Sequence, residues 1–530
     1  MPVADMPRSS VAITADNSRT GESLPPLALG VLIALCAAKL LLHLFTSVRG
    51  YGYFRDELYL LDCGRHLYWG YVDLAPLSAV YARVALLMGG SLPALRIIPA
   101  LAGTGLIALV IAITRQLGGN RFAQALAGLC VFLVPVNIVM DDFLSMNAFE
   151  PLFWMGCVYV LIRIIRTGNS RLWLWFGLLA GLGIENKHST LFFGLAVFLA
   201  VLLTGLRREF AKPWIWLGGL IALLIFLPNL VWQIHRNFPT VQDLENVRRT
   251  GKNIVLGPFA FIGQQIMMEQ PILAIFWITG LVSFLWGSGK RFRVLGVTFL
   301  IFFTELFILR GKDYYVAPIY PMMFAGGAVA VERWLARRSW AGARAWPKAA
   351  IATAIIILGG ILVPLFTPML SPERYLAYQH ALHIQLTKTE VATSGALPQF
   401  LGDQIGWDSL VRQIADIYNS LPPDERAKTG IWAGNYGEAG AVNLFGPAYG
   451  LPRAYSRHQN YWYWGPPPVV YTNLIVVQWS LDDVRDSCTS FQAFDHYSQF
   501  GMSEENTPIY LCRGAKFDIQ KIWWHSHHWN

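Results

Sequence analysis

Charged residues are scarce in this 530-residue sequence, and their scarcity excludes an ordinary soluble protein. Only 14% of the residues are charged, against about 25% in an average soluble protein. Hydrophobic residues make up 54% of the chain. The charge is missing mainly from residues 27–366, where apolar runs of about 20 residues, each long enough to cross a bilayer, follow one another. These runs predict a mainly α-helical, polytopic membrane protein.

Signals for nucleic-acid binding and for secretion are also lacking. The formal charge is +9, but there is no glycine-rich phosphate loop and no basic stripe with interleaved aromatic residues, so we expect no nucleic-acid partner. The basic residues lie in short loops between apolar runs, where they set topology.

Residues 1–26 are polar and weakly basic, and no small-residue cleavage site follows the first apolar run. We therefore expect the first span to be retained.

Cysteine is rare, with six residues in the whole chain. Three lie inside apolar runs, where they predict small core residues, and one lies in the first loop: Cys36, Cys130, Cys157 and Cys63. Cys488 and Cys512 are the two in the C-terminal region. A disulfide between them is expected if that region lies outside the cytosol, and two buried thiols are the alternative.

About eleven membrane spans are expected, near residues 27–47, 96–117, 122–139, 148–166, 172–186, 189–206, 213–231, 270–288, 293–309, 314–332 and 348–366. Alternate loops are rich in arginine and lysine, which the positive-inside rule places in the cytoplasm. They hold Arg115, Arg121, Arg163, Arg166, Arg171, Arg207, Arg208, Lys212, Lys290, Arg291, Arg293, Arg333, Arg337, Arg338, Arg344 and Lys348. Residues 1–26 then form a cytoplasmic tail, 27–369 the membrane domain, and 370–530 an extracytoplasmic domain, which is periplasmic if the membrane is a bacterial inner membrane.

The five loops on the opposite face carry charges of both signs close to the spans. They hold Arg55, Asp56, Glu57, Asp62 and Asp73; Asp141 and Asp142; Glu185, Lys187 and His188; Asp243, Glu245, Arg248, Arg249 and Lys252; and Arg310, Lys312 and Asp313 beside Tyr314 and Tyr315. Charges held against a membrane are expensive and often functional. One such loop would simply mark the water interface, but five on one face predict a shared site.

Residues 370–530 have an ordinary soluble composition. The patterns predict helices over 406–420 and from 438 and 481 onward, and strands over 429–434 and 473–478, which together indicate a small α/β domain. The turn after the first strand lacks a full glycine fingerprint and is interpreted as a packing turn. The aromatic run Tyr461–Gly465 could stack on a sugar or dock the domain on the bundle or membrane. His525, His527 and His528 lack metal-ligand spacing.

Three motifs near the start of the membrane domain resemble bacterial family 39 glycosyltransferases. They are Tyr53-Phe54-Arg55-Asp56-Glu57-Leu58-Tyr59, Gly70-Tyr71-Val72-Asp73-Leu74-Ala75-Pro76-Leu77 and Leu95-Arg96-Ile97-Ile98-Pro99-Ala100. The segments Asp142–Pro151 and Gly311–Pro321 are similar to the same group, whose relatives include protein O-mannosyltransferases and the lipid A aminoarabinose transferase. The resemblance covers most of residues 27–335. It implies a GT-C membrane fold.

The resemblance also implies an activity: transfer of a sugar from a polyprenyl-phosphate donor to an acceptor on the outer face, with inversion, and with Asp56 as the base. One departure stands out. Relatives commonly carry a basic residue, thought to touch the carrier phosphate, where this chain has Leu74. Either Lys187, His188, Arg310 or Lys312 replaces it, or the donor differs, or activity is lost.

The chemistry of transfer from a sugar phosphate fits these residue types. A carboxylate takes the proton of the attacking hydroxyl, and fixed cations stabilise the leaving phosphate. We expect Asp56 and Glu57 to serve as the catalytic carboxylates. Donor-phosphate contacts are expected from Lys187, His188, Arg310, Lys312, Tyr314 and Tyr315. Asp73, Asp141 and Asp142 are expected to orient the acceptor or to hold a divalent cation, and no cofactor is certain.

The function predicted from the sequence is a membrane glycosyltransferase whose partners are a polyprenyl-phosphate sugar donor, the bilayer, and a lipid, glycan or protein acceptor. An oligosaccharide ligase of similar architecture is one alternative. A transporter or flippase for a lipid-linked sugar is another. A transporter predicts charges near the bilayer midplane and internal repeats, whereas here the charges cluster at one interface and no repeat is visible.

Overall fold

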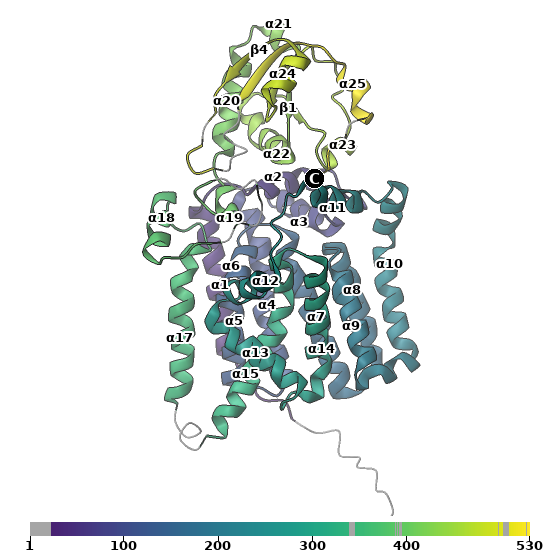
Figure 1. Ribbon diagram of the computed structural model, residues 1–530, viewed down its shortest axis with the longest axis vertical. Helices are drawn as coiled ribbons and strands as arrows, with labels where there is room; N and C mark the ends of the chain where they lie inside the picture. Colours follow the sequence, from purple (N-terminus) through teal and green to yellow (C-terminus); the bar gives the residue numbers. More distant parts are fainter. Residues whose placement is uncertain are drawn as a thin grey trace, which may run out of the picture.

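The computed structural model describes residues 23–338, 345–386, 388, 391, 395–496, 498–501, 508–525 and 527–529. Within them, a helical bundle and a smaller α/β domain are stacked end to end (Figure 1). This arrangement confirms the fold class expected from the sequence. Residues 1–22 of the predicted cytoplasmic tail lie outside the described range.

The helices of the bundle follow the apolar runs. They are α1 (Leu29–Arg49), α4 (Leu92–Gln116), α5 (Arg121–Leu133), α6 (Pro135–Met140), α7 (Met146–Thr167), α8 (Trp173–Asn186), α9 (Thr190–Leu203), α10 (Pro213–His235), α12 (Pro258–Met268), α13 (Pro271–Leu285), α14 (Arg293–Leu309), α15 (Tyr320–Ala336) and α17 (Trp346–Leu362). Three more helices lie at the end of the bundle that faces the α/β domain (Figure 1): α2 (Arg55–Arg65), α3 (Pro76–Leu87) and α11 (Pro239–Thr250).

Seven of the described helices are long and apolar enough to cross a membrane, or up to nine if two bent helix pairs each count as one span. The bent pairs are Thr190–Leu203 with Gly205–Ala211, at 102°, and Pro258–Met268 with Pro271–Leu285, at 105°. They overlap the predicted spans 189–206 and 270–288, and Pro258–Met268 precedes the second of these spans. Two more predicted spans, 122–139 and 172–186, hold shorter helices. In the first, Val134 is extended and Pro135 starts a new helix, which interrupts the run.

The α/β domain is built on a five-stranded sheet in the order β2-β1-β3-β5-β4. Its elements are α18 (Pro372–Ala381), α19 (Gln399–Gly402), α20 (Trp407–Ser420), α21 (Pro423–Arg426), β1 (Thr429–Ala433), α22 (Tyr436–Phe445), β2 (Ala454–Tyr455), α23 (Asn460–Tyr463), β3 (Asn473–Val477), α24 (Leu481–Ser487), β4 (Cys488–Phe494), β5 (Ile509–Ala515) and α25 (Ile519–Ile522). Strand β1 runs parallel to β2 and β3, whereas β5 is antiparallel to β3 and β4. Every helix and strand predicted for this region is present; β2, β4 and β5 were not predicted.

A disulfide joins Cys488 and Cys512 on the antiparallel strands β4 and β5. The two Cα atoms are 5.5 Å apart, within the usual range for a disulfide. Of the four free cysteines, Cys63, Cys130 and Cys157 are buried.

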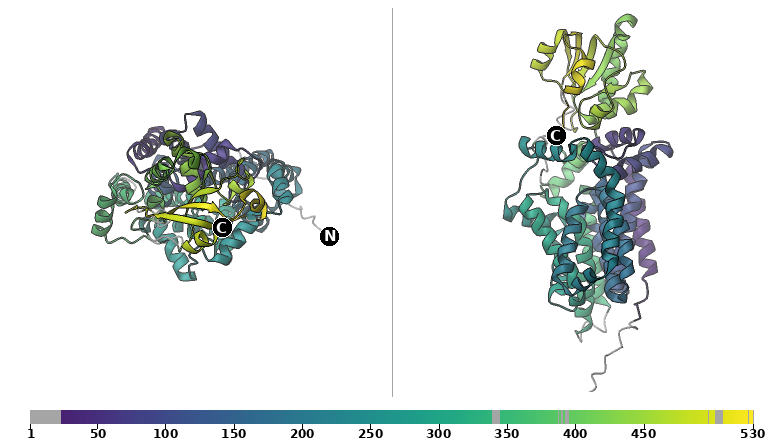
Figure 2. Two further views of the ribbon diagram at one scale, coloured as in Figure 1. Left: turned by 90° about the horizontal axis from the view of Figure 1, so that it is seen from above. Right: turned by 90° about the vertical axis from the view of Figure 1, so that its right-hand side faces the viewer.

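The α/β domain shares a hydrophobic core with the outer end of the bundle. Leu58 and Tyr59 of α2 belong to the same buried cluster as Trp407 and Leu410 of α20 and Ala439 of α22. Helix α22 packs backbone against backbone on α2, because a Cβ at Gly440 would lie 2.8 Å from the Leu58 carbonyl carbon. Figure 2 shows the domain resting on this end of the bundle. The shared core fixes the domain over the first outer loop.

The arginine-rich loops lie together at the opposite end of the bundle (Figure 1). Arg115 donates to the Pro25 carbonyl at 2.7 Å, and Arg166 donates to the Gln116 carbonyl at 2.6 Å. Arg333 reaches the Leu117 carbonyl at 3.2 Å. The last two of these bonds satisfy carbonyls at the C-terminus of α4, where positive charge is favourable.

Helices α8 and α10 pack at very short range through glycines. A Cβ at Gly218 of α10 would lie 2.3 Å from the Trp173 carbonyl oxygen, and one at Gly177 would lie 2.0 Å from the Gly218 carbonyl oxygen. The neighbouring Gly219 has no atom within 4 Å of an added Cβ. Of these two adjacent glycines, only Gly218 is therefore needed for close packing. Small residues often allow such close approach between membrane helices.

Gly218→Ala should force α8 and α10 apart and lower the thermal unfolding midpoint in detergent, because backbone atoms cannot yield to a side chain. Gly219→Ala is the matched control and should be neutral or slightly stabilising, since alanine is favoured over glycine in helices by about 1 kcal/mol. Tryptophan fluorescence or a cysteine-reactive dye would follow unfolding. Equal midpoints for the two variants would contradict this packing.

Candidate active site

The start of α2 places two consecutive carboxylates in different environments. Glu57 is fully buried and accepts hydrogen bonds from the backbone nitrogens of Phe54 and Leu144, both at 2.9 Å. The same carboxylate also pairs with the Arg96 guanidinium of α4, with Arg96 Nη2 3.1 Å from Glu57 Oε2. Every part of this carboxylate is engaged by protein. The expected catalytic role of Glu57 is therefore replaced by a structural one, the anchoring of α2.

Asp56 is the carboxylate that stays accessible. Its side chain is 42% exposed, and its Oδ1 accepts a hydrogen bond of 2.8 Å from the Tyr436 hydroxyl of α22. The neighbouring Arg55 places Nε 3.8 Å from the same oxygen. Consecutive helical residues point about 100° apart, so Glu57 faces the bundle while Asp56 faces the α/β domain. Asp56 thus combines access with fixed hydrogen-bond geometry, as a general base requires.

Asp73 lies in the loop between α2 and α3, beneath the α/β domain. Its Oδ1 accepts from the Tyr59 hydroxyl at 2.8 Å and from the Asn460 amide at 3.3 Å. Burial, together with the negative charge of Asp243, raises the pKa of Asp73 to about 7. The charge of Asp56 acts on it in the same direction, so these carboxylates belong to one electrostatic cluster.

Lys187 is held at the outer end of α8 by the first turns of α7. Its Nζ donates to Glu150 Oε2 at 2.7 Å and to Asn147 Oδ1 at 2.9 Å. Ser189 also donates a hydrogen bond to Glu150. We did not predict a role for Glu150 from the sequence. The signal was present, because an acidic residue in an otherwise apolar run is unusual.

Two tyrosines connect Lys187 to Lys312. The rings of Tyr314 and Tyr315 pack edge to face with centroids 4.9 Å apart. Lys187 Nζ lies 4.5 Å from the Tyr315 ring centroid, and Lys312 Nζ lies 5.9 Å from that of Tyr314. Two cations far apart in the sequence therefore flank one aromatic pair, which brings together four of the six residues expected to contact the donor phosphate.

The other two expected phosphate contacts lie in separate surroundings. His188 Nε2 is 3.3 Å from Asn229 Oδ1 of α10. Arg310 follows α14 in the left-handed conformation, with φ of 53°. It lines a cavity of about 370 Å³ with Leu256 of the loop before α12 and Pro258 at the start of that helix.

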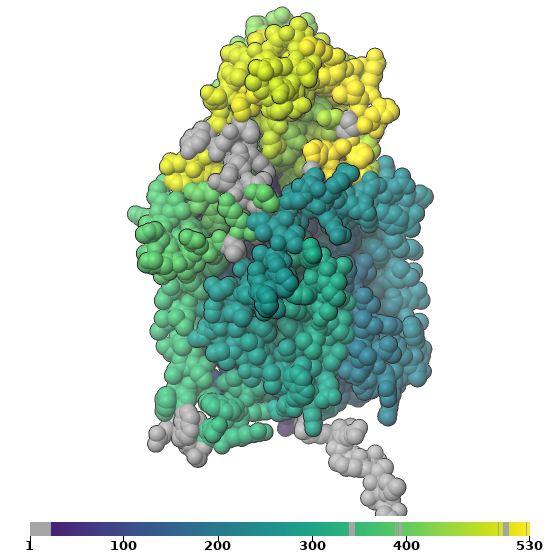
Figure 3. Space-filling model, viewed as in Figure 1, coloured from purple at the N-terminus to yellow at the C-terminus, as the bar shows by residue number. Residues whose placement is uncertain are grey.

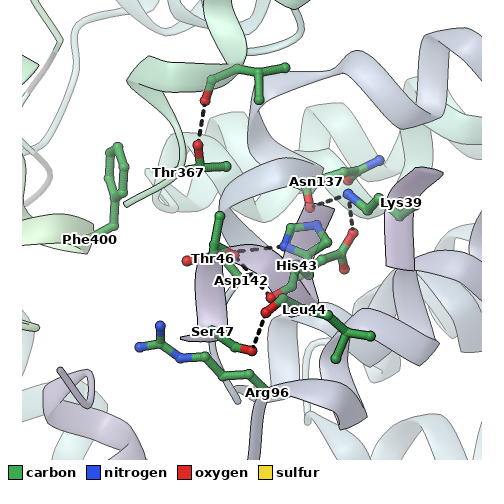
Figure 4. Close-up of polar contacts among 12 residues, drawn as sticks. Lys39, His43, Leu44, Thr46, Ser47, Arg96, Asn137, Asp142, Thr367 and Phe400 are labelled. Carbon is green, nitrogen blue, oxygen red and sulfur yellow. Dashed lines mark hydrogen bonds and ion pairs between the residues drawn. The ribbon is translucent and has the colours of Figure 1, made fainter. Parts of the chain in front are cut away.

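The connection between α6 and α7 places Asp141 and Asp142 inside the protein. Lys39 of α1 pairs with Asp141, Nζ to Oδ2 2.8 Å, and His43 Nδ1 lies 3.3 Å from Asp142 Oδ1. Thr46 donates to the same Asp142 oxygen at 2.6 Å. Figure 4 shows His43, Thr46 and Asp142 meeting between α1 and this connection. Both carboxylates are buried, so they tie α1 to the bundle. We had expected them to orient the acceptor or to hold a divalent cation, and their burial and their protein partners do not favour either role.

No group of three or more His, Cys, Asp or Glu side chains within the described residues is arranged to hold a metal ion. Three carboxylates of the first outer loop are instead paired within the protein: Glu57 with a cation, and Asp56 and Asp73 with neutral donors.

Leu74 is 4% exposed and belongs to the hydrophobic core shared by α2, α3 and the α/β domain. The position is a packing position in this chain, so Leu74 offers no contact to a phosphate.

The aromatic run also packs inward. Trp464 stacks on His66 at 4.4 Å, and Tyr463 meets Trp232 of α10 at 5.6 Å. Between sugar stacking and docking, these contacts favour docking of the domain on the bundle.

Comparisons with known proteins agree with this architecture. Residues 75–232 match the family model described as dolichyl-phosphate-mannose-protein mannosyltransferase. ArnT from Cupriavidus metallidurans in the apo state superposes with a TM-score of 0.57 at 15% identity, covering 92% of this chain and 98% of that one. Its structure bound to undecaprenyl phosphate gives 0.55 at 14% identity over 92% and 99%.

The arabinofuranosyltransferase AftD from Mycobacteria gives a TM-score of 0.52 at 14% identity, covering 94% of this chain and 41% of AftD. No curated protein sequence matches the chain significantly. At these identities the structural likenesses establish the fold, and they do so over nearly the whole chain.

Asp73→Asn should raise the thermal unfolding midpoint more at pH 8 than at pH 5. The pKa of Asp73 is raised to about 7 in the folded protein, so its contribution to stability is lost as pH rises through 7, where a buried charge must be held. Asparagine keeps the oxygen that accepts from Tyr59. Asp482→Asn, at a side chain 88% exposed, is the control. A midpoint shift that is the same at both pH values would contradict the raised pKa.

Proposed function

The chain belongs by fold to the GT-C membrane glycosyltransferases, and from this premise we propose that it transfers a sugar from a polyprenyl-phosphate donor to an acceptor hydroxyl. The single observation that carries the proposal is the contrast at the start of α2. Glu57 is buried, whereas the Asp56 side chain remains 42% exposed and is held by a hydrogen bond from Tyr436. We assign Asp56 as the general base.

The reaction that this assignment implies is a single displacement. The acceptor oxygen attacks the anomeric carbon while Asp56 takes its proton, and the bond between that carbon and the phosphate oxygen breaks. Polyprenyl phosphate leaves with the bonding electron pair. No second accessible carboxylate is needed, because no covalent sugar–enzyme intermediate forms. Such a step inverts the anomeric configuration.

The leaving phosphate gains negative charge, and fixed cations stabilise it best. The cluster of Lys187, Lys312, Tyr314 and Tyr315 offers two ammonium groups and two phenols. The residues before and within α7 support both halves of the site, since Leu144 binds Glu57, and Glu150 binds Lys187. In our proposal this cluster replaces the basic residue missing at Leu74.

The donor lipid is proposed by analogy of fold and by chemistry. ArnT, whose fold this chain shares over 92% of its length, has been solved with undecaprenyl phosphate bound. A phosphate carried on a polyprenyl chain would present its head group at the bilayer surface, where the lysine–tyrosine cluster follows the apolar helices α8 and α14. The disulfide between Cys488 and Cys512 supports an oxidising compartment for the α/β domain. We therefore place the site on the outer face of the cytoplasmic membrane.

The purified protein in detergent, given a polyprenyl-phosphate sugar labelled in the sugar and a crude acceptor fraction, should release polyprenyl phosphate and pass label to the acceptor. Asp56→Asn should lower turnover by about 10²–10⁴-fold, the usual effect of losing a general base. Asp62→Asn, on the same helix but paired with Arg65, is the control and should stay near the parent rate. A parent protein that leaves the donor intact would contradict a transferase and point to transport.

Lys312→Met and Lys187→Met should each raise KM for the donor by about 10–100-fold, the equivalent of one charge-assisted hydrogen bond to phosphate. Methionine keeps the stem of the side chain and removes only the charge. Lys212→Met is the control, because Lys212 pairs with Glu209 in one of the arginine-rich loops. An unchanged KM for the donor in both variants would show that the cluster does not bind the donor. The assignment of Asp56 would not be affected.

A further inference from the structure

The α/β domain meets the outer loops through a repeated pairing of a neutral donor with a carboxylate. Its side chains donate to four aspartates of the membrane domain: Tyr436 to Asp56 at 2.8 Å, Tyr461 and Asn443 to Asp62 at 2.6 and 2.7 Å, Asn460 to Asp73 at 3.3 Å, and Gln459 to Asp243 at 3.0 Å. Hydrogen bonds to charged acceptors are about twice as strong as neutral ones. The interface is therefore polar as well as hydrophobic, and one of its bonds ends on the proposed base.

Tyr436 is held rigidly enough to fix that bond. It opens α22, where Asn435 caps the helix and Glu438 completes the capping box. The Tyr436 ring stacks on His458 at 5.1 Å with planes 10° apart, and it packs against Tyr59 at 4.8 Å. Its backbone nitrogen donates to His458 Nδ1 at 3.2 Å.

We propose that Tyr436 is a positioning residue of the active site, so that the C-terminal domain completes the catalytic centre by orienting Asp56. This inference rests on the proposed function. Tyr436 does not touch the sugar; it acts through Asp56. With Oδ1 of Asp56 occupied by the hydroxyl, Oδ2 is left to receive the acceptor proton.

Charged and aromatic groups surround the bond between Tyr436 and Asp56. Arg55 places Nε 3.8 Å from Asp56 Oδ1, and its guanidinium lies 5.5 Å from the centre of the Tyr436 ring. Tyr59 and His458 flank the tyrosine ring. Burial raises the pKa of Tyr436 well above its usual value of 10, and the charges of Asp56 and Asp73 add to this against the opposing effect of Arg55. The hydroxyl therefore stays protonated and remains a donor at any working pH.

Tyr436→Phe removes the hydroxyl that fixes Oδ1 of Asp56. It should lower kcat about tenfold, the size expected for losing one hydrogen bond to a charge in the transition state. KM for the sugar donor should not change, because Tyr436 does not touch the substrate. A contact that only held the two domains together would not separate kcat from KM in this way.

Tyr461→Phe is the matched control. It removes the same chemical group from the same interface, but its partner is Asp62, which has no catalytic role in this account. It should lower the unfolding midpoint about as much as Tyr436→Phe does, with kcat and KM unchanged. An equal loss of kcat in both variants, or no loss in Tyr436→Phe, would overturn the proposal and leave a purely structural contact.

A second readout does not depend on turnover. The carboxylate band of Asp56, isolated in infrared difference spectra by subtracting Asp56→Asn, reports the hydrogen bond directly, because a bond to a charged acceptor changes the stretching frequency of the carboxylate. This frequency should shift in Tyr436→Phe and stay fixed in Tyr461→Phe. A shifted band in an inactive parent protein would support the positioning role and reject the transferase. Normal turnover with an unmoved band would do the reverse.

Discussion

The buried ion pair between Glu57 and Arg96 is the interaction on which the outer face of this protein depends. Arg96 also donates to the Gly52 carbonyl at 2.8 Å and to Gln404 Oε1 at 3.0 Å. The pair thus joins α2, α4, the segment before α7 and the start of the α/β domain. Breaking such a pair leaves an uncompensated buried charge and costs about 3–5 kcal/mol. Because Glu57 must face Arg96, the geometry of a helix turns Asp56 toward the α/β domain.

A second set of buried pairs secures the helix that leads into this loop. Helix α1 is only 17% buried over its most apolar window, so packing alone holds it weakly. Lys39 with Asp141, and His43 with Asp142, attach its polar face to the bundle. Burying a charged side chain within the membrane is costly unless it finds a partner, so these pairs favour one position of α1. Because α2 begins only a few residues after α1, the position of α1 also limits where α2 can begin.

The sequence predicted the parts of this protein that follow from hydrophobic length and period. The apolar runs predicted the helices, and the patterns at 406–420, 429–434 and 473–478 predicted α20, β1 and β3. The number of spans was harder to predict, because α5 and α8 are too short to cross a bilayer and the chain bends sharply between α12 and α13. Strands β4 and β5 were missed, since β4 is largely exposed and lacks a strong apolar signal.

The site was predictable as a set of loops but not as a set of contacts. Adjacent acids such as Asp56 and Glu57 look equivalent in a sequence, and only the position of Arg96 separates the buried one from the accessible one. Asp141 and Asp142 read as surface acids because their partners, Lys39 and His43, lie about 100 residues earlier in an apolar run. The contribution of Tyr436 depends on a contact between residues 380 positions apart. Such pairings depend on tertiary structure, which no local pattern encodes.

The central claim is that one accessible carboxylate, Asp56, drives a single displacement at the anomeric carbon. The anomeric configuration of the product tests this most directly. Proton NMR coupling constants of the freshly transferred sugar, compared with those of the donor, report the configuration at that carbon before any later exchange. The account predicts inversion. Retention would require a protein nucleophile and a covalent intermediate, and would contradict the assignment of Asp56 as a base.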